Sequence, residues 1–137
     1  MPHEQITVET VVNAPIDKVW EAYTSPEHIT KWNFASDDWC CPRANTDLRE
    51  GGRFSSRMEA KDGSMGFDFE GTYTKIVINE RIEYEFGDRH AAVEFVPQAD
   101  TVLVRVSFDP ETMFPVEQQR EGWRAILENF ARHVAAD

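Results

Sequence analysis

The feature that most constrains the fold is a series of short runs in which apolar and polar residues alternate. The runs fill the segment 53–108 and are separated by turn-forming residues such as Gly63 and Gly87. Strict alternation is typical of strands with one buried face, and tight turns join consecutive strands into antiparallel pairs. The segment 6–12 alternates in the same way. The pattern therefore predicts an antiparallel sheet of about six or seven strands, with one apolar and one wet face.

Two short helices are expected directly after the first strand. Pro15 suits the first turn of one helix, and an apolar stripe at helical spacing follows it. Ser25 is expected to cap the second helix. The residues that come next, 33–45, show no period and contain Pro42. We expect this stretch to form a long loop, and loops of that length in compact domains are commonly functional.

The chain ends in the longest predicted helix, from Pro115 to Ala135. At 1.5 Å per residue it is on the order of 30 Å long. Gly122 lies within it, where glycine would allow the sheet to approach closely or leave room for a bound group. The apolar stripe of this helix consists of Val116, Trp123, Ile126, Leu127, Phe130 and Val134. Because only the inner face of the sheet is large enough to bury this stripe, we predict an α+β fold in which a curved antiparallel sheet wraps around the C-terminal helix.

Size and charge narrow the functional classes. The 137 residues predict a single domain spanning 1–137. A net charge of −11 disfavours nucleic acid and membrane surfaces as partners, since both are anionic. No targeting segment is visible at the N-terminus. Cys40 and Cys41 are adjacent, which suits neither a disulfide nor a metal site. We therefore expect a reduced, cytoplasmic protein.

The predicted arrangement implies internal space. One helix, about 10 Å wide, does not fill the hollow of a curled sheet of this size. Aromatic residues make up 12% of the chain and can either line a ligand cavity or pack the hollow shut. The side chains that we expect to line a cavity are Trp32, Phe34, Trp39, Phe54, Met58, Phe69, Tyr84, Phe95 and Trp123. His90, Gln119 and Arg120 are candidates to orient a polar end of the ligand, although the last two could equally be solvated at the helix start.

Motifs for catalysis are not found. The chain has no G-x-S-x-G elbow, no P-loop and no H-E-x-x-H zinc motif. Asp68 and Glu70 alternate with phenylalanines and are expected to face outward, but a phase error of one residue would turn them into the hollow. We predict no catalytic residue, no metal site and no cofactor.

Several segments resemble START-like, or SRPBCC, domains. The resemblance is carried by VNAPIDKVW at 12–20, PEHITKW at 26–32, DLREGGRF at 47–54 and FEGTY at 69–73. EGWRAILENF at 121–130 resembles the terminal-helix signature of the branch named after the activator of Hsp90 ATPase. The resemblance implies a helix-grip fold with a hydrophobic cavity. Members of the superfamily bind lipids, polyketides and other apolar small molecules, and some are cyclases or hydrolases.

The function predicted from these observations is binding of a hydrophobic or aromatic small molecule, lipid-like or polyketide-like, in an internal cavity. Two alternatives stay open. One is a cyclase or aromatase acting on an apolar substrate, which needs an ionisable group in the hollow. The other is a chaperone-linked protein-interaction module, which needs an exposed apolar patch. The protein is expected to be a monomer or a homodimer.

Overall fold

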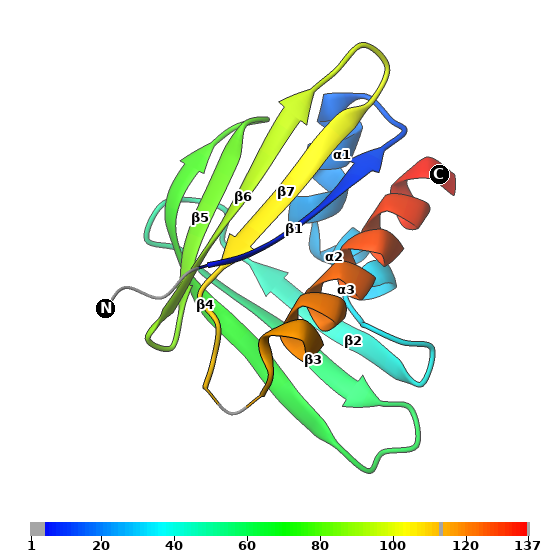
Figure 1. The fold of residues 1–137 in the computed structure, drawn as a ribbon, viewed down its shortest axis with the longest axis vertical. Helices are drawn as coiled ribbons and strands as arrows, with labels where there is room; N and C mark the ends of the chain where they lie inside the picture. The colour runs from blue at the N-terminus through cyan, green and yellow to red at the C-terminus, as the bar shows by residue number, and fades with distance from the viewer. Residues whose placement is uncertain (1–4, 113, 137) are drawn as a thin grey trace.

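The computed structural model describes residues 5–112 and 114–136. Seven strands form one antiparallel sheet in the order β1-β7-β6-β5-β4-β3-β2 (Figure 1). The strands are β1 Ile6–Val12, β2 Trp39–Thr46, β3 Arg53–Ala60, β4 Gly66–Val77, β5 Arg81–Phe86, β6 Arg89–Pro97 and β7 Val102–Phe108. The helices are α1 Ile16–Thr24, α2 Pro26–Trp32 and α3 Val116–Ala136. The predicted α+β helix-grip architecture is confirmed.

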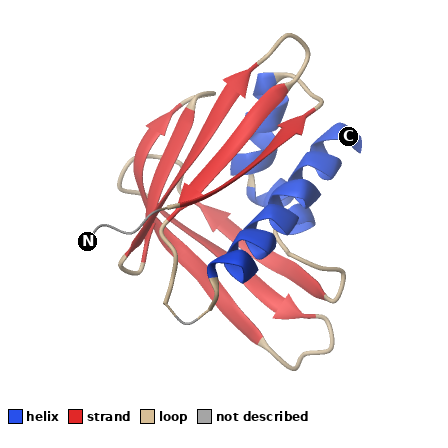
Figure 2. Ribbon diagram, viewed as in Figure 1, coloured by secondary structure: helices blue, strands red, loops and turns tan. Residues whose placement is uncertain are grey.

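The helices lie on the concave side of the sheet. Figure 2 shows the sheet bent so that β2, β3 and β4 diverge from β1, β6 and β7, with α3 running across the opening between them. α3 packs against β1 at one edge of the sheet, and α2 packs against β2 at the other. The helices therefore bridge the two open edges and enclose the space inside the curve. No helix in the described part of the chain is long and apolar enough to cross a membrane.

The alternating pattern sets which side of each strand faces this space. In β1, Val8 and Val12 are buried, whereas Glu9 points outward and pairs with Arg105 of β7 at 2.9 Å. In β4, the carboxylates of Asp68 and Glu70 are exposed, as the sequence predicts. The strand phase is thus correct, and no carboxylate of β4 enters the interior.

The segment 33–45 differs from its prediction as a long loop. Its second half is the edge strand β2, which pairs with β3. The register shifts between Cys40 and Arg43, and Pro42 lies within this irregularity. Proline is tolerated in edge strands, where its missing N–H costs no ladder bond. The strand forms because β3 supplies a partner for its backbone, and this long-range pairing leaves no periodic signal in the sequence.

Three local expectations for the helices are also corrected. Ser25 is the N-cap of α2, but its hydroxyl makes no capping hydrogen bond. Val116 is 46% exposed, so the buried stripe of α3 begins after it. A Cβ atom added to Gly122 would meet nothing within 4 Å. This glycine therefore does not serve a close approach of the sheet, and it does not belong to the cavity wall described below.

Candidate functional site

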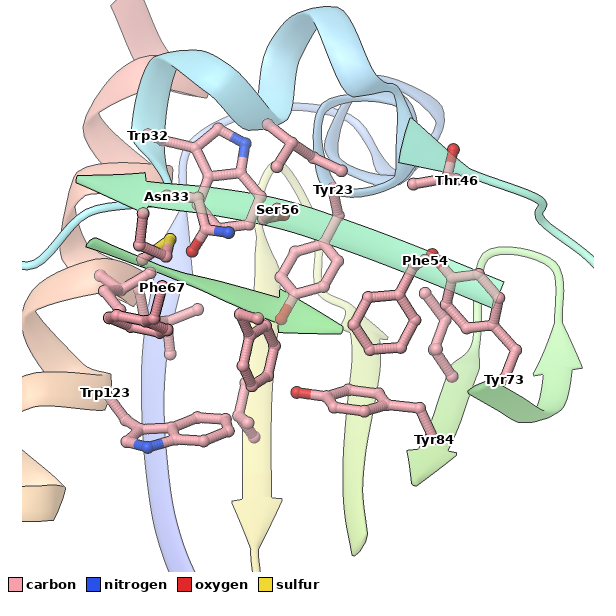
Figure 3. A pocket seen from close by; sticks show the side chains of 17 residues that line it. Tyr23, Trp32, Asn33, Thr46, Phe54, Ser56, Phe67, Tyr73, Tyr84 and Trp123 are labelled. Carbon is pink, nitrogen blue, oxygen red and sulfur yellow. The ribbon is translucent and has the colours of Figure 1, made fainter. Parts of the chain in front are cut away.

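A cavity of about 280 Å³ lies between α3, the two short helices and the concave face of the sheet (Figure 3). Its aromatic lining residues are Tyr23, Trp32, Phe54, Phe67, Phe69, Tyr73, Tyr84 and Trp123. Its aliphatic lining residues are Ile29, Met58, Ile82, Val106, Ile126 and Leu127. Its remaining lining residues, Asn33, Thr46 and Ser56, are polar but uncharged. The wall is therefore mostly apolar, with a few polar groups, which is typical of small-molecule sites.

The indole of Trp123 forms the α3 side of the cavity. It is stacked on Phe108 of β7 with ring centroids 3.9 Å apart and planes 9° from parallel. Phe69 meets the indole edge-on at 6.3 Å, and Phe86 lies at 5.9 Å. Such ring pairs stabilise the packing beyond the area that they bury. Contacts on several sides therefore fix the orientation of this wall.

Trp32 forms the wall at the end of α2. Its indole N–H donates a hydrogen bond to the carbonyl oxygen of Ala22 at 2.9 Å, which satisfies the only polar atom of the side chain. Its ring packs edge-on against Phe130 of α3 at 4.9 Å and lies 5.2 Å from Tyr23. The two short helices are thus held to the terminal helix through the cavity wall.

The three tyrosines of the chain all line the cavity. Burial raises the pKa of Tyr73 to about 12. Burial, followed by the neighbouring Tyr73, also raises the pKa of Tyr23. Burial raises the pKa of Tyr84 well above its ordinary value, with Tyr23 and Tyr73 adding to the shift and Arg89 opposing it. All three phenols therefore stay protonated at neutral pH and can donate hydrogen bonds.

Two of the other polar side chains in the cavity wall form hydrogen bonds within the protein. The hydroxyl of Thr46 donates to the carbonyl oxygen of Thr24 at 3.2 Å. Ser56 is buried beside Cys41 and hydrogen-bonds to its thiol. Burial raises the pKa of the Cys41 thiol, and this effect outweighs the opposing effect of its contacts with Ser56 and with the Arg43 backbone. Cys40 and Cys41 are both free. Within residues 5–112 and 114–136, no Asp, Glu, His, Lys or Arg lines the cavity.

Half of the residues predicted from the sequence line the cavity. They are Trp32, Phe54, Met58, Phe69, Tyr84 and Trp123. Three further predicted aromatics lie elsewhere. Phe95 is buried in the core, with its ring 5.2 Å from Trp20. Phe34 is partly buried and its carbonyl accepts a hydrogen bond from Asn129. Trp39 packs against the outer part of the wall, 6.1 Å from Phe67.

The three predicted polar residues do not reach the cavity. His90 is exposed on the outside, where it contacts Glu85 at 3.3 Å and Asp109 at 3.4 Å. Arg120 pairs with Glu117 one helical turn earlier. Gln119 is buried, but its amide holds the segment before α3 by bonding to the backbone of Glu111 and Phe114. None of the three therefore lines the cavity, and their contact with a ligand stays a prediction.

Three aromatic lining residues were missed, although signals for them exist. Phe67 and Tyr73 share the strand phase of Phe69. Tyr23 continues the apolar stripe of the first helix. The stripe and the phase identify these residues as inward-facing, but not whether each meets empty space or a neighbouring side chain. That distinction depends on the curvature of the sheet, which brings residues from five strands and three helices together.

A curved antiparallel sheet closed by a long C-terminal helix over an apolar cavity defines the START-like, or SRPBCC, class of domain. The model of the family described as activator of Hsp90 ATPase homolog 1-like protein matches residues 13–135. The chain belongs to this family.

Solved structures support the same assignment. The AHSA1-like protein from Aeromonas hydrophila is 40% identical, with a TM-score of 0.91 over 96% of this chain and 92% of that chain. Chr148 from Cytophaga hutchinsonii is 47% identical, with a TM-score of 0.82 over 94% of this chain and 90% of that chain. CV1439 from Chromobacterium violaceum shares the fold at 24% identity, with a TM-score of 0.84 over 97% of this chain and 99% of that chain. No curated protein matches the sequence.

Proposed function

We propose that this protein binds an apolar or aromatic small molecule in the cavity and does not transform it. The observation that carries the proposal is the cavity itself, about 280 Å³ in volume and walled mostly by rings and aliphatic side chains. Transfer of an apolar molecule from water into such a site is favourable, by roughly 25 cal/mol for each Å² of apolar surface buried, before the costs of association.

The volume sets the size of the ligand. A dry apolar cavity of about 150 Å³ is large enough to bind benzene. The cavity here, at about 280 Å³, is nearly twice that size. A molecule of two fused rings is therefore the expected scale, whereas a long lipid chain would have to extend past the wall to solvent. Phe67, which is 50% exposed, lies where such an extension would emerge.

The proposal is tested by titrating the protein with benzene, naphthalene and anthracene while following tryptophan fluorescence. Trp32 and Trp123 both line the cavity and report on occupancy. We expect naphthalene to change the emission saturably and to raise the melting temperature. No change in either signal with any of the three compounds would reject the proposal.

A matched pair of variants locates the site. Ile126→Phe adds a ring to the cavity wall, and Arg124→Phe adds the same ring on the exposed side of the same helix. We expect Ile126→Phe to weaken naphthalene binding at least about tenfold, since it fills the space that the ligand needs, and Arg124→Phe to leave binding unchanged. Equal effects of the two substitutions would place the ligand elsewhere.

Catalysis by a cyclase or aromatase is the less favoured alternative. It needs a group that takes up or releases a proton near neutral pH inside the cavity. The titratable side chains that line it, within the described residues, are the three tyrosines. Their raised pKa values suit them as hydrogen-bond donors and not as bases at neutral pH. Incubation of a bound two-ring compound with the protein should return it unchanged.

A chaperone-linked role is the second alternative, suggested by the description of the family. It is favoured by Met65 and Phe67, which are 66% and 50% exposed on the turn and strand after β3. Calorimetry with purified Hsp90 tests it directly, using Met65→Ser as the variant that should weaken any contact.

We also propose that the protein is cytoplasmic and is a monomer or a homodimer. Light scattering of the purified protein distinguishes the two oligomeric states.

A further inference from the structure

We propose that the ligand is a neutral aromatic molecule of two-ring size whose carbonyl oxygen accepts hydrogen bonds from Tyr23 and Tyr84. This inference rests on the proposed function, and it adds the chemical class of the ligand and the two residues that recognise it.

The two hydroxyls come from opposite walls of the cavity. Tyr23 belongs to α1, on the side closed by the helices, and Tyr84 belongs to β5 in the sheet. In Figure 3 the hydroxyl of Tyr23 points down toward the sheet and that of Tyr84 points toward the side of Trp123, so that the two oxygens lie in the same part of the cavity, where the two groups also interact electrostatically. The hydroxyls therefore point toward a common region that a bound molecule would occupy.

Both rings are held in place by neighbouring rings. Tyr23 packs against Trp32 at 5.2 Å and edge-on against Phe130 at 5.1 Å. Tyr84 is only 7% exposed and meets Phe54 edge-on at 5.0 Å. Since neither ring can swing away without breaking these contacts, the positions of the hydroxyl oxygens are fixed before a ligand arrives.

The described part of the chain leaves both hydroxyls without a hydrogen-bond partner. Among the described residues, no protein atom forms a hydrogen bond with the hydroxyl of Tyr23 or Tyr84, and both oxygens can be reached from the cavity. Buried tyrosines usually find a hydrogen-bond partner. A ligand that displaces water from these hydroxyls and offers no polar atom leaves them unsatisfied, which is costly. The cavity therefore favours a molecule with a polar atom at this point.

The polar atom is best supplied by a neutral carbonyl. A carbonyl oxygen has two lone pairs and can accept from both phenols, each of which has one proton to donate. An anion would be buried without a counter-charge, because no cationic residue of the described chain lines the cavity. Arg89 lies beyond Phe86, 4.6 Å from that ring, and pairs with Glu111 at 3.6 Å. The charge of Arg89 is thus paired with a carboxylate outside the cavity.

The test uses two probes of the same shape. In 2-isopropenylnaphthalene, a methylene group replaces the carbonyl oxygen of 2-acetonaphthone, so the pair differs only in its ability to accept hydrogen bonds. Affinities are measured by calorimetry for the wild type, Tyr23→Phe, Tyr84→Phe and Thr46→Val. The last variant removes a wall hydroxyl that already donates to Thr24 and serves as the control. Melting temperatures verify that each variant folds.

We expect each tyrosine substitution to weaken ketone binding about tenfold, as loss of one hydrogen bond to a buried group does, and to change alkene binding less than about twofold. Thr46→Val should affect both probes alike. As a second measurement, the carbonyl stretching frequency of the bound ketone should be lower in the wild type than in Tyr84→Phe. A third probe, 2-naphthoate, should bind at least about tenfold more weakly than the ketone because its charge is not compensated.

Three results would overturn the inference. The first two would leave the proposed function standing, and the third would reject both. If the alkene binds but the tyrosine substitutions change ketone and alkene affinity equally, the cavity binds ligands without recognising a carbonyl. If 2-naphthoate binds as tightly as the ketone, the ligand class is not neutral. If neither neutral probe binds the wild type, both the proposed function and this inference are rejected.

Discussion

The ring of Phe54 lies so close to the backbone of Gly71 that a Cβ atom there would lie 2.8 Å from the Phe54 Cζ atom. The same Cβ would lie 2.2 Å from the carbonyl oxygen of Glu85 on the neighbouring strand. Glycine is therefore needed here for close approach and not for an unusual backbone conformation. By letting the Phe54 ring approach the backbone of β4, Gly71 allows this ring to lie in the cavity wall, 5.0 Å from Tyr84.

Gly71→Ala should consequently destabilise the protein by about 1–3 kcal/mol, the usual cost of overpacking a filled site. Urea denaturation of the two proteins measures the difference. We also expect the displaced Phe54 ring to reduce naphthalene affinity. A variant as stable as the wild type would mean that the strands separate here at no cost.

Gly122→Ala should have the opposite effect. Because an added Cβ would contact nothing within 4 Å, only helix propensity changes, and alanine is better than glycine within a helix by roughly 1 kcal/mol. The melting temperature should rise, and ligand affinity should stay the same since this residue does not line the cavity. A loss of ligand affinity in this variant would show that Gly122 contributes to binding.

Gln119→Ala should destabilise the protein without affecting the cavity. The amide accepts from the Glu111 N–H at 2.9 Å and donates to the carbonyl oxygens of Glu111 and Phe114 at 3.0 and 2.8 Å. Loss of these bonds should cost about 1–3 kcal/mol. Gln118→Ala, on an exposed neighbour, should change stability by less than about 0.5 kcal/mol. If Gln119→Ala weakens naphthalene binding while remaining folded, its exclusion from the site is wrong.

The tyrosines predict a specific behaviour at high pH. Their folded pKa values lie above the ordinary value of 10.0, and that of Tyr73 is raised to about 12. Because the folded protein favours the neutral phenols, their raised pKa values contribute to the free energy of unfolding. This contribution is fully present below pH 10 and is lost as the pH rises through the folded pKa values. Phenolate absorbance should therefore appear above pH 10, together with unfolding. Reversible titration of a tyrosine at pH 10 in the folded protein would show that its hydroxyl is solvated.

Much of the fold follows from short-range patterns. The inward-facing side of β4 could be predicted because Phe67 and Phe69 alternate with Asp68 and Glu70. The start of α1 after Pro15 was readable because proline suits a helix N-terminus. β2 could not be predicted, since its extended form depends on pairing with β3 and not on any alternation of its own.

The site was predicted less well than the fold because lining a cavity is a property of curvature. Phe95 and Tyr84 both face inward from adjacent strands, but only Tyr84 meets empty space, whereas Phe95 meets Trp20. The polar residues of the site were harder to predict than the aromatic ones. Gln119 lies on the inner side of α3 and was expected near a ligand, but the backbone before the helix occupies its amide.

The central claim, that a two-ring aromatic molecule binds inside the curve of the sheet, is tested most directly by a crystal structure of the protein with 2-bromonaphthalene. The anomalous signal of bromine locates the ligand independently of any interpretation of the surrounding density. We predict a single strong peak inside the cavity, in the region toward which the hydroxyls of Tyr23 and Tyr84 point. A peak only on the outer surface would contradict the account.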